Sequence, residues 1–241
     1  MTGPVFAPSL ASGATPTITL RRVGHEAQPV LILDGLLTGA EALVDFAVEQ
    51  AVLAPVKAAA NFYPGVRAPC PGGYVQALVT ALRPHLAEVF AAPPGCRAHV
   101  TSALSMAVLP AAEANLPQRL PHIDTSDPCQ LAILHYLCEP AHGGTAFYRH
   151  RATGFETVGP DRAQPYFAAL RAELDQGPPD GGYISNSNSM FEQTQAVDVV
   201  FNRVVVYPSN LLHAGMLPDV PLSTDPRAGR LTANTFFRFE A

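Results

Sequence analysis

The sequence contains no long apolar run, no cluster of basic residues and no leader-like segment. No stretch reaches the roughly eighteen apolar residues that a membrane-spanning helix needs. With a net charge of −5 and scattered arginines, the chain offers nothing suited to a polyanion, so nucleic-acid binding is not expected. Residues 1–16 lack the basic start and apolar core of a signal peptide, and we expect a flexible tail there.

Cysteine is scarce, and the motifs of several enzyme classes are missing. The four cysteines show neither C-x-x-C spacing nor the density of a disulfide-rich secreted domain, so they are predicted to be free thiols in a reducing, cytoplasmic setting. The chain has no G-x-G-x-x-G after a strand, no Walker sequence and no G-x-S-x-G elbow. These absences argue against dinucleotide-binding, P-loop and serine-hydrolase functions.

The first part of the chain has the pattern of a strand followed by helices. At 241 residues with 48% apolar content, the chain suits one domain with a sizeable core. We expect a buried strand at 29–35 and a helix at 38–52 that opens with a capping box from Thr38 to Glu41. A second helix is expected at 74–90, kinked or divided at Pro84. The segment between them, 55–73, is predicted to be a loop whose part 63–67 lies over a site.

From Ala98 onward the pattern changes to short β-like runs separated by Pro, Gly and Asn. Because regular alternation of strands and helices is missing, the predicted fold is mainly β (α+β): a double-stranded β-helix, or jelly roll, preceded by a strand and helical flank at 29–95. The core is expected at 98–241, with an insertion at 155–197 whose residues 183–191 form a second candidate lid. The strand-like runs are 98–109, 130–137, 145–148, 199–207 and 231–239.

His122 and Asp124 form the most informative motif, an H-x-D pair. An H-x-D pair is expected by chance in about one chain in three of this composition, so the pair needs support from other residues. On extended backbone the two side chains point to the same face. His213, which follows an apolar strand, can supply a third ligand. Two imidazoles and one carboxylate leave three octahedral positions open, which suits a non-haem Fe(II) oxygenase better than structural zinc.

Arg230 and Thr232 follow on a later predicted strand, where they share one face. An arginine fork beside a hydroxyl group suits the distal carboxylate of a dicarboxylate, because it forms charge-assisted hydrogen bonds that lysine reproduces poorly. The gap between His213 and Arg230 contains an extra loop, so Arg227 and Arg238 stay open as alternatives.

This ordered set of residues resembles the 2-oxoglutarate- and Fe(II)-dependent dioxygenases, in their prolyl-hydroxylase-like branch, to which the segment Gly143-Gly144 is also similar. The resemblance covers roughly 102–239 and is nearest to an uncharacterised bacterial subgroup. It implies that His122, Asp124 and His213 bind iron. It further implies that Arg230 and Thr232 bind 2-oxoglutarate, with a hydroxyl from Tyr136 or, less favoured, Tyr207.

The implied reaction is hydroxylation of an unactivated C–H bond in an amino-acid-like or other small or peptidyl substrate, with O2 consumed and succinate and CO2 released. Halogenation is disfavoured by the same resemblance. Related halogenases have a small residue at the position of the carboxylate ligand, which leaves room for a halide, whereas this sequence has Asp124 there. Two other hypotheses stay open: a cupin-like metalloenzyme that does not use 2-oxoglutarate, and a non-catalytic jelly-roll binding module.

Overall fold

Two antiparallel sheets form the centre of the protein in a computed structural model, which describes residues 15–55, 63–177, 179, 181–218 and 222–240. Most of the expected N-terminal tail, 1–14, lies outside the described residues. The helices are α1 (Glu41–Glu49), α2 (Gly72–Phe90), α3 (Leu116–Arg119) and α4 (Pro160–Gln176), with a 3-10 turn at Pro140–His142. The strands are β1 (Thr17–Val23), β2 (Gln28–Asp34), β3 (Ala54–Pro55), β4 (Gly65–Pro69), β5 (Ala98–Ala107), β6 (Gln130–Tyr136), β7 (Thr145–His150), β8 (Phe191–Val197), β9 (Arg203–Pro208), β10 (His213–Gly215) and β11 (Arg230–Phe239).

The strand order is that of a jelly roll. The large sheet runs β1-β2-β9-β6-β11-β5-β4-β3 and the small sheet β10-β7-β8. A bridge between His122 and His213 adds the His122 segment to the small sheet beside β10. The core has eight segments in chain order: β5, the His122 segment, β6, β7, β8, β9, β10 and β11. Segments 1, 8, 3 and 6 are neighbours in the large sheet, and segments 2, 7, 4 and 5 are neighbours in the small sheet. The predicted double-stranded β-helix is therefore confirmed.

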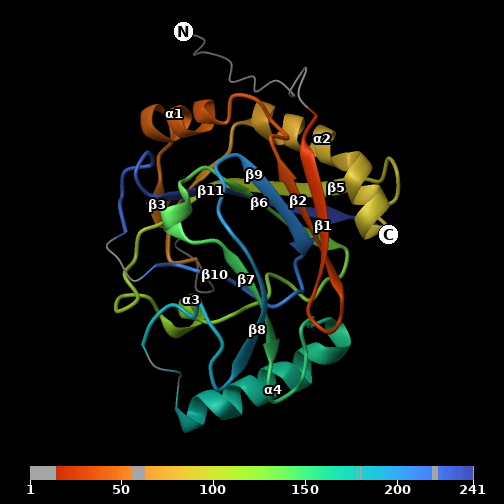
Figure 1. The fold of residues 1–241 in the computed structure, drawn as a ribbon, viewed down its shortest axis with the longest axis vertical. Coiled ribbons are helices and arrows are strands. Elements are labelled where there is room, and N and C mark those ends of the chain that lie inside the picture. The colour runs from red at the N-terminus through yellow and green to blue at the C-terminus, as the bar shows by residue number, and fades with distance from the viewer. Residues whose placement is uncertain (1–14, 56–62, 178, 180, 219–221, 241) are drawn as a thin grey trace.

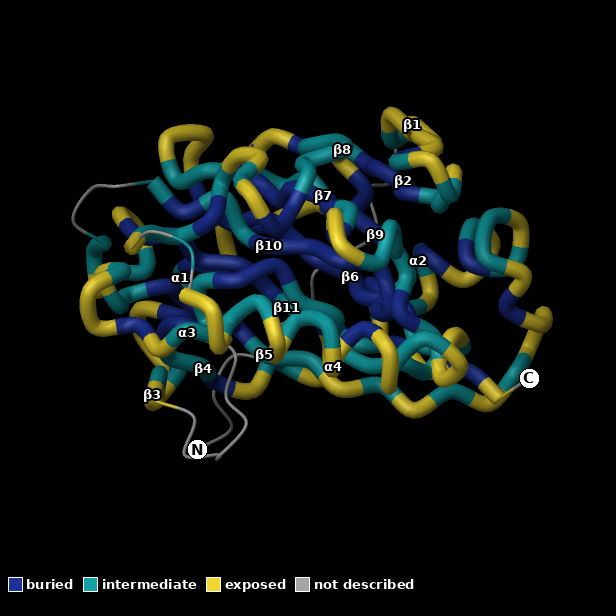
Figure 2. The backbone as a smooth tube through the Cα atoms, turned by 90° about the horizontal axis from the view of Figure 1, so that it is seen from below, coloured by how far each residue is buried: buried dark blue, intermediate teal, exposed yellow. Residues whose placement is uncertain are grey.

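The apolar side chains sort into layers because successive residues of a strand face opposite ways. In β6, Leu131 and Ile133 pack in the cluster that contains α2, whereas Ala132 and Leu134 face the space between the sheets. Helices α1 and α2 lie at one end of the molecule over the large sheet, and α4 lies at the other end beside β7 and β8 (Figure 1). The strands at the centre are buried while the loops and helix exteriors are exposed (Figure 2).

Two local predictions were wrong, and one of two alternatives for a third is excluded. Helix α1 begins at Glu41 with Ala40 at its N-cap and no side-chain cap, so the expected capping box from Thr38 does not form. Helix α2 is not divided at Pro84, because a stripe of fully buried leucines holds it on the large sheet while Pro84 is exposed; the alternative, a kink, stays a prediction. The segment expected to be a loop at 55–73 contains β4, which pairs with β5.

The expected insertion at 155–197 is shorter than predicted. Its last residues form β8, which pairs with β7 as the edge of the small sheet. The inserted part is therefore α4 and the loop that follows it. Its start is tied to the turn between β1 and β2, where the Glu156 carboxylate accepts the backbone N–H groups of His25 and Glu26 at 2.7 and 2.9 Å. Among the described residues, no helix is both long and apolar enough to cross a membrane.

Candidate metal and cosubstrate site

Main-chain hydrogen bonds bring the three predicted ligands together. His122 lies in the segment before β6, and His213 is the first residue of β10. Their backbones exchange two hydrogen bonds, each 2.9 Å, and the Asp124 N–H donates to the Ser209 carbonyl at 2.8 Å. One nitrogen of each histidine and one oxygen of Asp124 all lie within 4.8 Å of one another. This spacing suits three ligands around one metal ion.

Each histidine is oriented by a backbone carbonyl. The Nδ1 atom of His122 lies 3.3 Å from the Leu120 oxygen, and that of His213 lies 2.8 Å from the Leu211 oxygen. Because a carbonyl can only accept, each Nδ1 carries the proton and each Nε2 keeps its lone pair. The Nε2 atom of His213 is 3.7 Å from the Asp124 carboxylate. Such a tautomer is the one that metal-binding histidines use.

Burial sets the charge of the three side chains. It lowers the pKa of both His122 and His213 to about 4, so both imidazoles are neutral at pH 7. It raises the pKa of Asp124 to about 6, although His122 and Arg67 pull that pKa down. At pH 7 the set consists of two neutral nitrogen donors and one carboxylate. Among the described residues these three form the only such ligand group, which leaves room for exogenous ligands on a six-coordinate ion.

Arg230 is held rigidly at the start of β11. Its side chain is buried, and its Nε donates to the carbonyls of His142 and Gly143 at 3.1 and 3.4 Å. Its Nη2 donates to the Gly144 carbonyl at 3.1 Å. The guanidinium lies beside Gly215 of β10, where a Cβ would be 3.4 Å from that Nη2 atom. Neutral carbonyls orient this cation without neutralising its charge.

One cavity of about 360 Å³ joins the metal-ligand set to Arg230. Thr232 and Tyr136, predicted to assist Arg230, are buried beside it: the Thr232 hydroxyl donates to Asn234 at 2.8 Å, and the Tyr136 hydroxyl lies 2.7 Å from that of Thr145. Asn234 and Thr145 themselves line the cavity. The roles of Thr232 and Tyr136 stay predictions. The structure adds Asn234 and Thr145 as further residues that could bind the cosubstrate.

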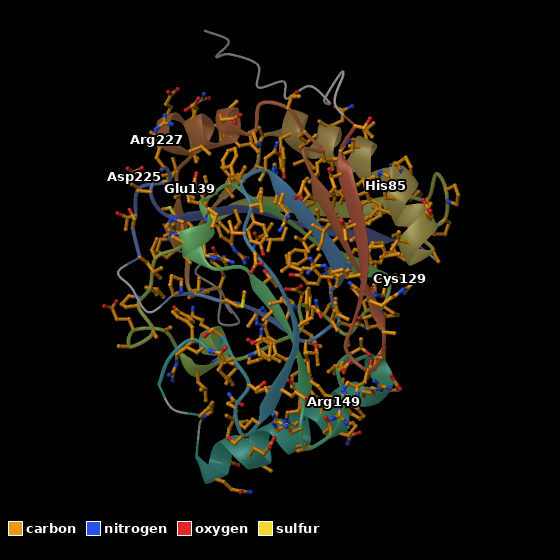
Figure 3. All side chains as sticks on the ribbon, in the orientation of Figure 1. His85, Cys129, Glu139, Arg149, Asp225 and Arg227 are labelled. Carbon is orange, nitrogen blue, oxygen red and sulfur yellow. The ribbon has the colours of Figure 1, made fainter. Side chains whose placement is uncertain are left out.

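The other arginines considered from the sequence lie elsewhere. Arg227 pairs with Asp45 at 2.7 Å, near α1 at the periphery of the molecule (Figure 3), and Arg238 pairs with Asp127 at 2.6 Å on the surface. Neither lines the cavity. Tyr207 does line it, with its ring 4.8 Å from that of His213.

Sequence patterns did not single out Arg119, and they placed three other cavity residues near a site only as parts of the two expected lids. Tyr63 and Arg67 from the first lid and Tyr183 from the second line the cavity together with Arg119. Arg67 lies on β4, a strand that the proline-rich sequence did not reveal. Its position on the inner face follows from pairing with β5, which local sequence cannot predict.

Comparison with known proteins gives a family without a stated activity. Residues 14–237 match a family described as a family of unknown function (DUF6445). The sequence matches no curated protein.

Several solved structures are similar at low identity. AviO1 from Streptomyces viridochromogenes Tue57 is 17% identical, with a TM-score of 0.45 over 84% of this chain and 82% of its own. The non-heme alpha-ketoglutarate-dependent epimerase SnoN from nogalamycin biosynthesis is 12% identical (TM-score 0.48; 89% and 80% covered). HygX from Streptomyces hygroscopicus, solved with nickel, 2-oxoglutarate and hygromycin B, is 13% identical (TM-score 0.48; 88% and 84% covered). Likenesses at this level are too weak to transfer an activity.

Proposed function

The chain belongs to the family of unknown function DUF6445, and we propose from its site that it is an Fe(II)- and 2-oxoglutarate-dependent oxygenase. The observation that carries the proposal is the convergence of His122, Asp124 and His213 within 4.8 Å, in the cavity that Arg230 also lines. Two neutral imidazoles and a carboxylate, with three positions left open, are the donor set that non-haem Fe(II) oxygenases use.

The protein's own groups account for binding and orientation. The Nε2 atoms of both histidines and the Asp124 carboxylate would hold the iron, while Arg230 would bind the distal carboxylate of 2-oxoglutarate by charge-assisted hydrogen bonds. Asn234 and Thr145 lie in the same cavity as polar neighbours. Tyr207 packs against His213 and lines the same cavity.

When bound, iron and 2-oxoglutarate supply the oxidising chemistry: O2 converts 2-oxoglutarate to succinate and CO2, and the second oxygen atom enters a substrate C–H bond. We propose hydroxylation of an amino-acid-like or other small or peptidyl substrate. The Asp124 carboxylate would serve as the third protein ligand to iron, which disfavours halogenation.

Anaerobic titration of the metal-free protein with Fe(II), then 2-oxoglutarate, tests the proposal. We expect a metal-to-ligand charge-transfer absorption band that needs both components. His213→Ala should weaken iron binding at least about 100-fold, because it removes a direct ligand. Arg230→Ala should weaken 2-oxoglutarate binding while iron binding stays near the wild-type value.

His85→Ala, on α2 at the periphery (Figure 3), is the matched control and should leave both affinities unchanged. Absence of the band in the wild-type protein would sink the proposal. Tight iron binding with no response to 2-oxoglutarate would instead favour a cupin-like metalloenzyme.

A further inference from the structure

The cavity carries more positive charge than the cosubstrate would neutralise. Its described lining contains three guanidinium groups, from Arg67, Arg119 and Arg230, and one carboxylate, from Asp124. Counted over guanidinium and carboxylate groups, the described lining therefore contributes a net charge of +2, whereas the whole chain has a net charge of −5.

The proposed ligands leave this excess in place. Fe(II) adds two positive charges, and 2-oxoglutarate, a dianion, removes two. Arg230 is the residue expected to meet the distal carboxylate of the cosubstrate. The remaining +2 therefore belongs to Arg67 and Arg119. Unpaired charges in a partly buried cavity are costly, so such a site favours an anionic ligand.

Arg67 has the position and the free hydrogen-bonding capacity to bind that ligand. The register Arg67↔Ser105↔Thr232 across β4, β5 and β11 places it on the same inner face as Thr232. Its guanidinium lies 4.6 Å from the centre of the Tyr63 ring, and its Nε is buried without a hydrogen-bond partner. Buried polar atoms are nearly always paired, so this one is available to a ligand.

Arg119 lies at the end of α3 and shows the same feature. Its Nε is also buried without a hydrogen-bond partner, while its backbone carbonyl accepts from the Ile184 N–H at 3.2 Å. Tyr183, Tyr63 and both arginines line the same cavity, and Tyr63 stacks on Arg67. These two arginines and two tyrosines are here called the Arg67 cluster.

Arginines outside the cavity either pair with a carboxylate or are exposed to solvent. Of these eleven described arginines, five lie within 4.0 Å of a carboxylate and the other six are exposed. Arg67 and Arg119 are only partly exposed, and neither forms such an ion pair within the described ranges. The five pairs are Arg149–Glu192, Arg162–Glu26, Arg203–Asp34, Arg227–Asp45 and Arg238–Asp127. Arg67 and Arg119 thus have no carboxylate within ion-pair distance among the described residues.

We propose that the primary substrate carries a carboxylate or phosphate group, which binds to Arg67 and Arg119 in the Arg67 cluster. The proposal rests on the proposed function, because it assigns 2-oxoglutarate to Arg230. A guanidinium can bind either oxyanion through two parallel hydrogen bonds, and the Tyr63 ring holds the Arg67 fork in place. The anion would fix the substrate near the metal ligands, since Arg67 and Arg119 line the same cavity as those ligands.

Three small probes of similar shape test the proposal: benzoate, phenyl phosphate and benzyl alcohol. Binding to wild-type protein loaded with Mn(II) and 2-oxoglutarate is measured by ligand-observed NMR and calorimetry. We expect at least one anion to bind about ten-fold or more tightly than the alcohol. The better anion identifies the substrate group as a carboxylate or a phosphate.

Arg67→Met should remove most of this preference, Arg119→Met part of it, and Arg67→Lys should keep some because the charge remains. Arg149→Met is the control and should match wild type, since Arg149 pairs with Glu192 outside the cavity (Figure 3). Equal binding of all three probes to the wild-type protein would overturn the proposal, as would an unchanged preference in Arg67→Met.

A separate titration distinguishes this inference from the proposed function. Arg67→Met should bind 2-oxoglutarate within about three-fold of wild type. A loss as large as that in Arg230→Ala would make Arg67 a cosubstrate residue and overturn the substrate assignment. If the wild-type protein bound no 2-oxoglutarate, the proposed function would fail, and the anion preference would still be measured on the Mn(II)-loaded protein.

Discussion

At the scale of single residues, two adjacent glycines determine how closely the strands can approach around Arg230. Gly143 has a φ of +71°, and a Cβ there would lie 1.7 Å from the Met216 carbonyl oxygen. A Cβ on Gly144 would lie 1.9 Å from the Val197 carbonyl oxygen. Both glycines therefore allow backbone contacts that any side chain would prevent. Their own carbonyls then face Arg230.

Gly144→Ala should destabilise the protein by roughly 2–4 kcal/mol, because the backbone at Val197 and Asp198 must move to admit one methyl group. Chemical denaturation monitored by circular dichroism measures the change. Gly72→Ala is the matched control, since a Cβ there meets nothing within 4 Å, and it should change stability by less than about 0.5 kcal/mol. Equal stability of the two variants would contradict this account of the glycine pair.

At the scale of elements, His135 connects its own strand of the large sheet to a helix and a turn that pack against it. Its Nε2 lies 3.0 Å from the Asn202 Oδ1 and its Nδ1 lies 3.2 Å from the Tyr74 hydroxyl. Because the amide oxygen accepts, Nε2 carries the proton and Tyr74 donates to Nδ1. Asn202 also donates to the Leu37 carbonyl at 2.8 Å. Strand β6, helix α2 and the turn before β9 are thereby connected.

His135 should make the protein less stable in mild acid. Burial lowers its pKa from 6.5 to about 4, despite the hydrogen bond to Asn202 that raises it. Between these values the unfolded chain binds a proton that the folded protein does not, so stability is full above pH 6.5 and falls as pH drops toward 4. In this range the unfolding free energy is expected to fall by about 1.4 kcal/mol for each pH unit.

Denaturation curves of wild type and His135→Leu at several pH values measure this effect. The variant should lose about 1–3 kcal/mol at pH 7.5, because two polar partners are left unpaired. Near pH 5 its stability should depend on pH less steeply than that of wild type. Parallel pH profiles for the two proteins would show that His135 is not the residue responsible.

At the scale of the whole molecule, the proposed site depends on both sheets. Two of its ligands are adjacent across the small sheet, while Arg230 extends from the large sheet to the carbonyls that precede β7. Metal and cosubstrate should therefore stabilise the complete fold. They would bind the folded chain and not the unfolded one.

Saturation with Mn(II) at about 100 times its Kd should raise the unfolding free energy by about 2.7 kcal/mol. For a chain of this size that corresponds to a Tm increase of roughly 5–10 °C in scanning calorimetry. Added 2-oxoglutarate should raise Tm further only when Mn(II) is present. His213→Ala should show little increase, and an increase equal to that of wild type would place the metal elsewhere.

The sequence by itself determined the features that depend on short spacing. Runs of apolar residues predicted the main core strands, and this succeeded because side-chain direction along a strand has a period of two and needs no knowledge of distant partners. The H-x-D pair, His213 and Arg230 were also singled out from the sequence, and the structure brings them to one cavity, while their roles stay predictions.

Only the tertiary structure decided which distant segments meet. Strands β4 and β8 were missed because proline-rich or polar sequence becomes a strand through pairing with β5 and β7. Arg227 and Arg238 could be set aside only when the fold placed them in surface ion pairs. The register of β4 likewise directed Arg67 into the cavity, since the burial of a charge depends on neighbours far away in the chain.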